Sequence, residues 1–576
     1  MNHRISISMH AGLCMLFLVN GLAHAVRKFE PQPLHVTSFY KRLDTSMEDH
    51  KEKRHPSVKV RYTAADTLCD QEKAFRQKRM PKVRKLLTNF LNQQKGKKGT
   101  FKKGMSKTKE PVTIPGAAPI IGLCLSGGGF RAMILGLGCI KGLVDIGLWD
   151  SVAYCAALSG SSWGVSSWMA ANSVRKPNEA VTIDDFISQL QTRLKNGLTP
   201  KLSPQLAAQA FEYCVRKIFA FQSNTITDIY GFLLANILLE SLGNNRFKAT
   251  LSDTHEWIQD GSVPMPIYTA IETSIKPYEW FEFSPFEIGS SYLRSYIPTS
   301  AFGRRFHNGV SSLSSMGAPA PSLGYDMGIF GSAYTASLKD VLRQAMEVIL
   351  GEMKVPKDFG IPASVLNQIK SYLTFNLPYL LNSPWVQHFT ETKWGDIASM
   401  RFFPTRVPNF CYHLPLCPLR ELKDIYLVDA GVSGNLPVAP LLRPARNVDI
   451  IIIYDSSAYV KGAPALRAAA DYAKRHKLKF PPINYEGIGK RLISVFAADD
   501  PKTPAVIYIP RIANPAYSKT FDPAQCVDQG PCSTLNFAYT PDQFKELVGL
   551  PAATIKQNED TIRSIIKMRL ASKKKR

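Results

Sequence analysis

The chain has 576 residues, of which 45% are apolar and 20% are charged, a composition that excludes a largely disordered or polytopic membrane protein. Its formal net charge of +25 favours anionic partners such as lipid headgroups, nucleic acid or an acidic cell surface. The length allows one to three domains, including a single α/β domain with large insertions.

Residues 1–25 resemble a secretory signal peptide. Arg4 precedes an apolar run, and Ala23 and Ala25 place small residues at the −3 and −1 positions of a cleavage site before Val26. An amphipathic anchor or a buried first helix is the alternative. No later run of about 18 uncharged apolar residues occurs, so we expect no transmembrane helix and predict an exported protein, periplasmic or secreted, that is peripheral to membranes.

Removal of Cys14 with this segment leaves nine cysteines. Cys411 and Cys417 are close in sequence, as are Cys526 and Cys532, so in an exported chain each pair can close a small loop. No Cys or His cluster has the spacing of a zinc site, and we expect neither a metal nor a cofactor.

Residues 26–110 form a charge-rich lead, in which 71–91 have the apolar spacing of a basic amphipathic helix and the following residues are typical of a flexible linker. Between Arg76 and Lys109 there are thirteen Lys or Arg and no acid, and we expect these to be mostly exposed, on a solvated basic face or on a surface that binds anionic membranes. Residues 561–576 are expected to be a basic tail.

Two strand–turn–helix units follow. Residues 119–125 predict a buried strand, a glycine turn comes next, and 131–148 predict a helix; a second strand at 151–158 runs into Ser159, and 161–171 predict its helix. This repetition indicates an α/β core.

The main α/β domain is expected at 111–560. Residues 177–400 are richer in helical patterns, Pro and aromatic residues, and are predicted to be a cap insertion. Two buried strands, at 425–431 and 448–457, then return to the core. We therefore predict an α/β fold with a central mixed sheet flanked by helices and an inserted cap.

Ser159 is a candidate nucleophile. A serine on a sharp turn from a strand to a helix exposes its hydroxyl and requires small neighbours, and Ala157 and Ser161 are small although they depart from the G-x-S-x-G pattern. Taken alone, an ordinary turn is equally compatible. The three glycines at 127–129 strengthen the case, because their N–H groups can approach an oxyanion closely; a nucleotide-binding turn is the alternative, but the G-x-G-x-x-G spacing and the Walker lysine are missing.

A serine nucleophile needs a base, and the histidines are poor candidates. His476 lies in a basic polar stretch that we expect to be solvated, and the histidines upstream have no informative neighbours. Asp429 ends an apolar strand and could act directly as the base, with a turn-capping aspartate as the alternative. If both strands are parallel, Ser159 and Asp429 emerge at the same edge of the sheet.

Six motifs in sequence order resemble the catalytic domain of the cytosolic phospholipase A2 (group IV) and fungal lysophospholipase family, which is distantly similar to patatins. The match spans roughly residues 112–515, and the motifs read LSGGGFRAM, ALSGSSW, WFEFSPFEIG, GIFGSAY, LVDAGVSGNLPVAPLLRPARNVDIIIIYDSSA and KLKFPPIN.

The resemblance implies a role for five residues. Ser159 matches the family's nucleophile, Asp429 its dyad partner, Gly128 and Gly129 the oxyanion glycines, and Arg131 the arginine thought to engage the substrate phosphate. The implied reaction is the release of a fatty acid from a glycerophospholipid or lysophospholipid at a membrane surface or in micelles. The chain ahead of the core is too short for the C2 domain of some relatives, so calcium-dependent targeting is not expected.

Two other classes of function remain open from the sequence. A lipid-surface or interaction protein could keep the fold without activity, although all five of these residues are intact. The basic lead has no recognisable nucleic-acid-binding motif, so nucleic-acid binding is not expected.

Overall fold

The computed structural model describes residues 57–93, 112–114, 116–176, 179–197, 226–312, 320–334, 404–527 and 529–574. The expected signal peptide, most of the linker and a large part of the expected cap lie outside the described residues. Among the described helices, none combines the length and the apolar character needed to cross a membrane.

The described strands form one large mixed sheet and a small hairpin. The large sheet has 12 strands in the order β1-β7-β6-β5-β4-β3-β2-β12-β14-β13, with β11 paired to β4 and β10 paired to β11. The strands are β1 (Arg61–Tyr62), β2 (Ile121–Leu125), β3 (Val152–Leu158), β4 (Met265–Glu272), β5 (Glu279–Phe283), β6 (Glu287–Ser290), β7 (Ser295–Pro298), β8 (Phe306–His307), β9 (Val310–Ser311), β10 (Thr405–Pro408), β11 (Asp424–Asp429), β12 (Ile450–Asp455), β13 (Ser494–Phe496) and β14 (Ala505–Pro510).

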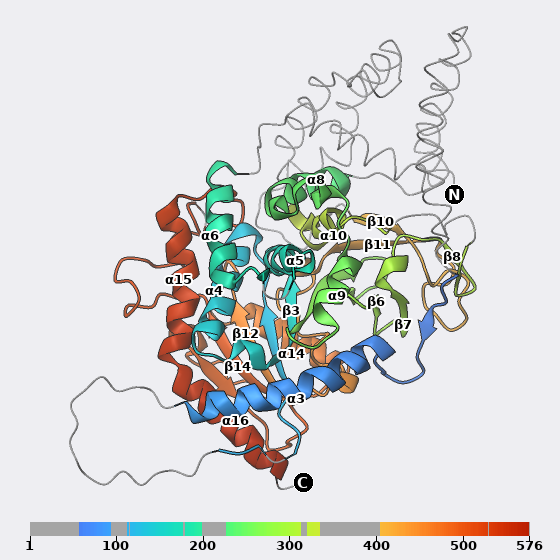
Figure 1. Ribbon diagram of the computed structural model, residues 1–576. Helices are drawn as coiled ribbons and strands as arrows, with labels where there is room; N and C mark the ends of the chain where they lie inside the picture. Colours follow the sequence, from blue (N-terminus) through green and yellow to red (C-terminus); the bar gives the residue numbers. More distant parts are fainter. Residues whose placement is uncertain are drawn as a thin grey trace, which may run out of the picture.

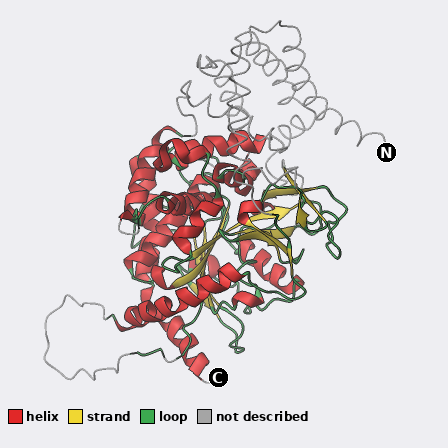
Figure 2. Ribbon diagram, turned by 45° about the vertical axis from the view of Figure 1, so that its right-hand side comes forward, coloured by secondary structure: helices red, strands yellow, loops and turns green. Residues whose placement is uncertain are grey.

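Helices cover the sheet, and Figure 2 shows most of them on one side of the strands. They are α3 (Asp70–Asn92), α4 (Gly129–Asp145), α5 (Gly160–Ser173), α6 (Ile183–Arg193), α8 (Ile226–Leu238), α9 (His255–Ile258), α10 (Leu323–Phe330), α14 (Pro464–Arg475), α15 (Pro541–Gln557) and α16 (Glu559–Lys574). The central sheet flanked by helices that the sequence predicts is confirmed.

Alternating side chains of the central strands divide the core into two layers. Leu123 and Ile452 pack with α4, α5 and α15 on one face, whereas Cys124 and Ile453 pack with α14 on the other. The β4-β3-β2-β12-β14 strands are parallel and buried on both faces, which explains their almost continuous apolar sequences.

The expected cap boundaries need correction. Residues 265–298, inside the span assigned to the cap, form β4, β5, β6 and β7 of the main sheet, and β4 pairs with β3 in parallel. Their apolar, aromatic-rich sequence is that of buried strands. The described part of the expected cap is therefore divided between strands of the main sheet, the β8–β9 hairpin and helices that include α6, α8, α9 and α10; α8 and α10 lie together above the sheet (Figure 1).

The strands β3 and β11 meet on β4. Leu158, the last residue of β3, pairs in parallel with Thr269, and Asp429, the last residue of β11, pairs in antiparallel with Ala270. β3 and β11 thus run toward each other along one edge of β4. The prediction that both residues leave parallel strands is wrong for Asp429, because β11 approaches from the opposite direction.

Helix α3 belongs to the packed fold. Val83, Leu87 and Phe90 are buried, and the guanidinium of Arg79, which is 0% exposed, donates to main-chain carbonyls that include Val152 O at 2.6 Å. The helix predicted at 71–91 is confirmed, but its expected exposure is wrong for Arg79. Residues from Thr561 to Lys574, expected as a tail, continue α16, which buries its apolar side chains against the core.

A buried ion cluster joins α3 to the sheet. Arg446 donates to both oxygens of Glu72 on α3, at 2.8 and 3.0 Å, and to Glu282 on β5 at 2.7 Å. Arg443 also contacts Glu282 and donates to Asp66 at 2.7 Å. Burial alone would raise the pKa of Glu72, but the charge and hydrogen bonds of Arg446 outweigh it and hold this pKa below its usual value.

We expect Glu72→Gln to lower the free energy of unfolding by about 3 kcal/mol in urea at neutral pH, because it removes one of the two carboxylates that neutralise the buried Arg446 charge. The depressed pKa of Glu72 means that this stabilisation is present above the ordinary glutamate range and is lost as pH falls through the folded pKa. Asp70→Asn, on an exposed residue of the same helix, is the control and should change stability by less than about 0.5 kcal/mol. Equal effects of the two variants would contradict a stabilising cluster.

Candidate active site

Ser159 occupies a strained turn between β3 and α5. Its φ of 50° and ψ of −123° are unusual for a residue with a side chain. A Cβ at Gly160 would lie 1.8 Å from the carbonyl oxygen of Gly129, so only glycine fits there. This geometry, a serine held between a strand and a helix with a glycine behind it, is that of a nucleophile elbow.

The glycine turn lies against the serine. Gly128 and Gly129 have φ values of 139° and 63°, which side chains disfavour; Gly128 caps α4, and Gly129 is its first residue. A Cβ at Gly127 would lie 2.9 Å from Cβ of Ser159. Among the described residues, no acceptor engages the N–H groups of Gly128 and Gly129. The start of α4 therefore presents N–H groups beside the serine, where negative charge is favoured.

Ser159 and Asp429 form a direct pair. Ser159 Oγ donates to Asp429 Oδ2 at 2.8 Å, and each residue is 1% exposed. Asp429 Oδ1 accepts from Gly431 N at 2.8 Å, while the main-chain N–H of Asp429 donates to Ser332 Oγ at 3.0 Å. The sequence alone does not single out Ser332, although it lies in the GIFGSAY motif.

Burial of Asp429 has an electrostatic consequence. Removal from water raises the pKa of Asp429 to about 7, against the opposing effect of the hydrogen bonds from Gly431 and Ser159. A carboxylate with this pKa can accept the serine proton near neutral pH far better than an ordinary aspartate.

The described histidines lie apart from this pair. His476 stacks on Tyr472, with ring centroids 4.3 Å apart, and its Nε2 lies 3.6 Å from Glu279 Oε1. Its side chain is 24% exposed, so the ring is partly buried, although Lys474, Arg475 and Lys477 in the same stretch are exposed as expected. No described histidine donates to or accepts from Ser159 or Asp429; His388 lies outside the described residues.

Arg131, expected to engage a phosphate, is 1% exposed. Its Nη1 donates to the carbonyl of Cys532 at 2.6 Å and to Thr534 Oγ1 at 2.8 Å, and its Nε donates to the carbonyl of Ser456 at 3.1 Å. The guanidinium therefore joins the glycine turn to two other segments. Cys532 forms a disulfide with Cys526, one of the two pairs that the sequence suggests.

The other suggested pair, Cys411 and Cys417, consists of free, buried thiols. A hydrogen bond with Cys417 is the main reason that the pKa of Cys411 is raised. The two side chains are therefore neighbours, as their spacing suggests, but they are reduced in this structure.

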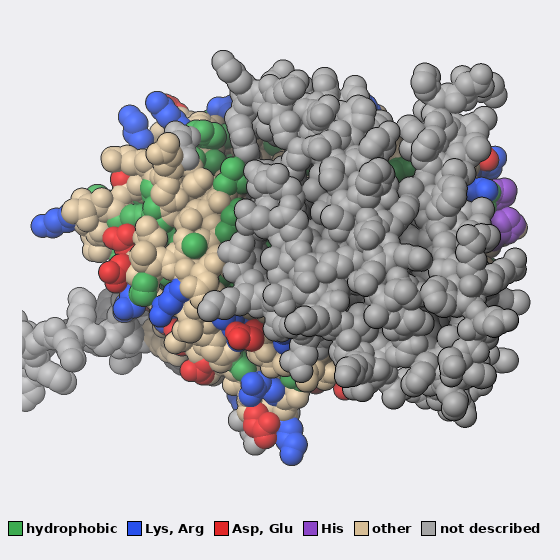
Figure 3. All heavy atoms as spheres, turned by 90° about the horizontal axis from the view of Figure 1, so that it is seen from above, with side chains coloured by type: hydrophobic (Ala, Val, Ile, Leu, Met, Phe, Trp, Pro, Cys, Tyr) green, Lys and Arg blue, Asp and Glu red, His purple; other side chains and the backbone are tan. Residues whose placement is uncertain are grey.

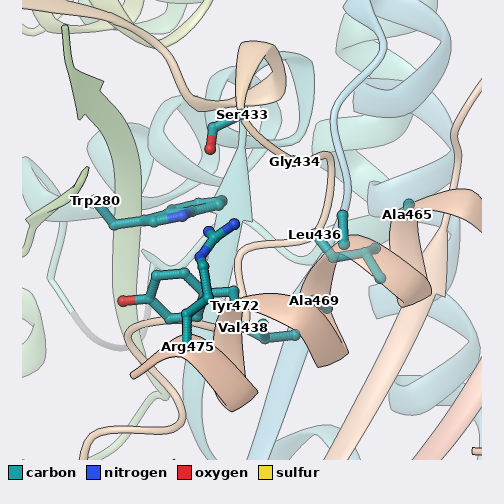
Figure 4. Close-up of a pocket in the computed structure, with 10 residues that line it drawn as sticks. Trp280, Ser433, Gly434, Leu436, Val438, Ala465, Ala469, Tyr472 and Arg475 are labelled. Atoms are coloured by element: carbon teal, nitrogen blue, oxygen red, sulfur yellow. The ribbon is translucent and has the colours of Figure 1, made fainter. Parts of the chain in front are cut away.

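A small pocket borders the segment that follows Asp429. Trp280, Ser433, Tyr472 and Arg475 line it on one side, with Leu436 and the alanines of α14 opposite (Figure 4). Neither Ser159 nor Asp429 contributes to its lining. The pocket is thus separate from the Ser159–Asp429 pair and borders only the segment that follows Asp429.

The comparisons with known proteins agree with the fold. The family model for the lysophospholipase catalytic domain matches residues 121–473, which include both members of the pair. The chain belongs to this family.

Individual relatives are more distant. The mouse cytosolic phospholipase A2 zeta is 26% identical over 567 residues, and the match covers 87% of this chain and 62% of that protein. The human GIVD cytosolic phospholipase A2 superposes with a TM-score of 0.65 at 19% identity, covering 89% of this chain and 68% of that one. A complex of the human protein with methyl γ-linolenyl fluorophosphonate gives a TM-score of 0.61 at 20% identity, with coverages of 89% and 66%.

The raised pKa of Asp429 predicts a pH-dependent stability. The folded protein binds this proton more tightly than the unfolded chain does, so stability falls as pH rises from about 4 to about 7 and the cost is complete above that range. Asp429→Asn removes the titration and should raise the melting temperature more at pH 8 than at pH 5, corresponding to about 2–4 kcal/mol. Asp471→Asn, on an exposed residue of α14, is the control; a gain for Asp429→Asn that does not vary with pH would contradict the raised pKa.

Proposed function

We propose that this protein is a serine acylhydrolase that releases fatty acids from glycerophospholipids or lysophospholipids. The observation that carries the proposal is the hydrogen bond of 2.8 Å between Ser159 Oγ and Asp429 Oδ2. The neighbouring N–H groups at the glycine turn and the membership of the lysophospholipase family support the same reaction.

The reaction has two acyl-transfer steps. Asp429 takes the proton of Ser159 as Oγ attacks the ester carbonyl, and the oxyanion receives hydrogen bonds from the N–H groups of Gly128 and Gly129. Asp429 then gives the proton to the leaving alcohol, and the fatty acyl group remains on Ser159. Water, activated by the same carboxylate, hydrolyses this ester and restores the serine.

The substrate is at a lipid surface, so the protein must reach membranes or micelles. Lys78, Arg84 and Lys85 on α3 are exposed and have no ion pair among the described residues, which suits attraction to anionic lipid. Figure 3 shows another face, where the described basic and acidic side chains are interspersed with hydrophobic ones. Peripheral association through α3 is therefore part of the proposal.

Export is also part of the proposal and rests on the sequence of residues 1–25 and on the Cys526–Cys532 disulfide. The relatives are named as cytosolic proteins. Sequencing the N-terminus of the mature protein tests export, and an intact Met1 would contradict it.

An inactive lipid-surface protein with the same fold is the alternative function. It requires no acyl-enzyme, no paired carboxylate and no raised pKa at Asp429. The presence of all three glycines, the serine and the aspartate in one buried cluster favours the enzyme.

Ser159→Ala and Asp429→Asn should each reduce turnover by at least about 10³-fold while the protein stays folded, because losing one member of a catalytic unit costs nearly the whole effect. Mass spectrometry of products from position-labelled phospholipids and lysophospholipids is the measurement. His476→Ala is the control and should stay near wild type. A dead His476→Ala enzyme together with an active Asp429→Asn enzyme would show that a histidine is the base.

Arg131→Lys distinguishes two roles for the guanidinium. As the link between the glycine turn and the 532–534 segment, Arg131 should affect an uncharged monomeric ester and a phospholipid alike, and we expect losses of about 10-fold or more on both, because one ammonium cannot replace the planar fork. A clearly larger loss on the phospholipid would support the phosphate contact that the family resemblance implies.

A further inference from the structure

Asn435 connects the segment after Asp429 to the glycine turn. Its Nδ2 donates to the main-chain carbonyl of Gly127 at 3.0 Å, and its own main-chain carbonyl accepts from Gly127 N at 3.4 Å. Both main-chain polar groups of Gly127 are thus engaged by one residue, which lies 308 positions away in the chain.

The orientation of the Asn435 amide is fixed by a chain of buried groups. Nδ2 also donates to Ser457 Oγ at 2.7 Å, and Ser457 Oγ in turn donates to Asp455 Oδ1. Asp455 is 0% exposed, and its other oxygen accepts from the hydroxyl of Tyr508 at 2.7 Å. Because the Ser457 hydroxyl donates its proton to Asp455, its oxygen must accept the hydrogen bond from Asn435. The two protons of Asn435 Nδ2 therefore have the Gly127 carbonyl and Ser457 Oγ as their acceptors.

The geometry points to Asn435 as a positioning residue for the oxyanion donors, an inference that rests on the proposed function. The carbonyl of Gly127 and the N–H of Gly128 belong to the same planar trans peptide and point in opposite directions. Because Asn435 binds the Gly127 carbonyl, the N–H of Gly128 must point away from Asn435. Both residues that flank this peptide bond are glycines, so no side chain in the local sequence opposes a rotation of the Gly127–Gly128 peptide plane.

The same amide lies near the other parts of the proposed site. A Cβ at Gly127 would lie 2.7 Å from Asn435 Oδ1, 2.5 Å from Leu158 Cδ2 and 2.9 Å from Ser159 Cβ. A Cβ at Gly431, beside Asp429, would lie 3.4 Å from Asn435 Oδ1. Asn435 therefore lies where the glycine turn, the end of β3 and the segment that carries the base come together.

The test compares Asn435→Leu and Asn435→Asp with Asn484→Asp, an exposed residue that gives the same change of charge outside this network. A soluble monomeric ester gives kcat and KM, an alkyl fluorophosphonate gives the rate at which Ser159 is modified, and thermal unfolding reports the fold. We expect both Asn435 variants to lose about 10- to 100-fold in kcat and in the modification rate, with KM within about twofold, because a misplaced N–H stabilises the transition state poorly. Asn484→Asp should match wild type.

A double-mutant cycle tests the chain of hydrogen bonds. Ser457→Ala should lower kcat by a smaller factor, and adding it to Asn435→Leu should cause no further loss, because both variants remove the same orientation. If Asn435→Leu does not fold, Ser457→Ala and Asn435→Asp provide the test.

Three results would overturn the inference. One is an Asn435→Leu enzyme with kcat within twofold of wild type while Ser159→Ala is dead, which leaves the proposed function intact. Another is a raised KM at unchanged kcat, which would place Asn435 on the substrate. The third is turnover by Ser159→Ala, which would remove the proposed function itself and with it the role of Asn435.

Discussion

The site depends on one constraint, namely that β3 and β11 end on adjacent residues of β4. Leu158 pairs with Thr269 and Asp429 with Ala270, so main-chain hydrogen bonds to a single strand set the distance between serine and carboxylate. Side-chain rotamers then need to adjust only slightly to give the hydrogen bond of 2.8 Å. The two residues are 270 positions apart in sequence, but the sheet holds them at a fixed separation.

Two helices begin at this junction, α4 after the glycine turn and α5 after Ser159. Their first N–H groups have no intrahelical acceptor, and neither helix has a side-chain cap. The surroundings are buried, where such dipoles act more strongly than in water. The arrangement favours an anion near the hydroxyl of Ser159. The same burial raises the pKa of the neighbouring Asp429 carboxyl.

Local sequence was sufficient for some parts of this arrangement and insufficient for others. The turn at Ser159 and the turn at Gly128 are encoded by short strand–glycine–helix patterns, so their elements are predictable. The direction of β11 in the sheet depends on the strand with which it pairs, and the sequence of β11 itself does not identify that strand. The burial of Arg79 and the roles of Ser332 and Asn435 depend on acceptors and donors far away in the chain, which spacing cannot reveal.

The ion cluster between α3 and the sheet has a consequence for how the protein is made. Glu72 leaves the ribosome 374 residues before Arg446, its main partner. At usual rates of synthesis this delay is roughly 20 to 75 s, during which Glu72 lacks the Arg446 guanidinium and the apolar face of α3 has no sheet to cover. The first described helix must therefore wait in water, or with a chaperone, until nearly four fifths of the chain has been translated.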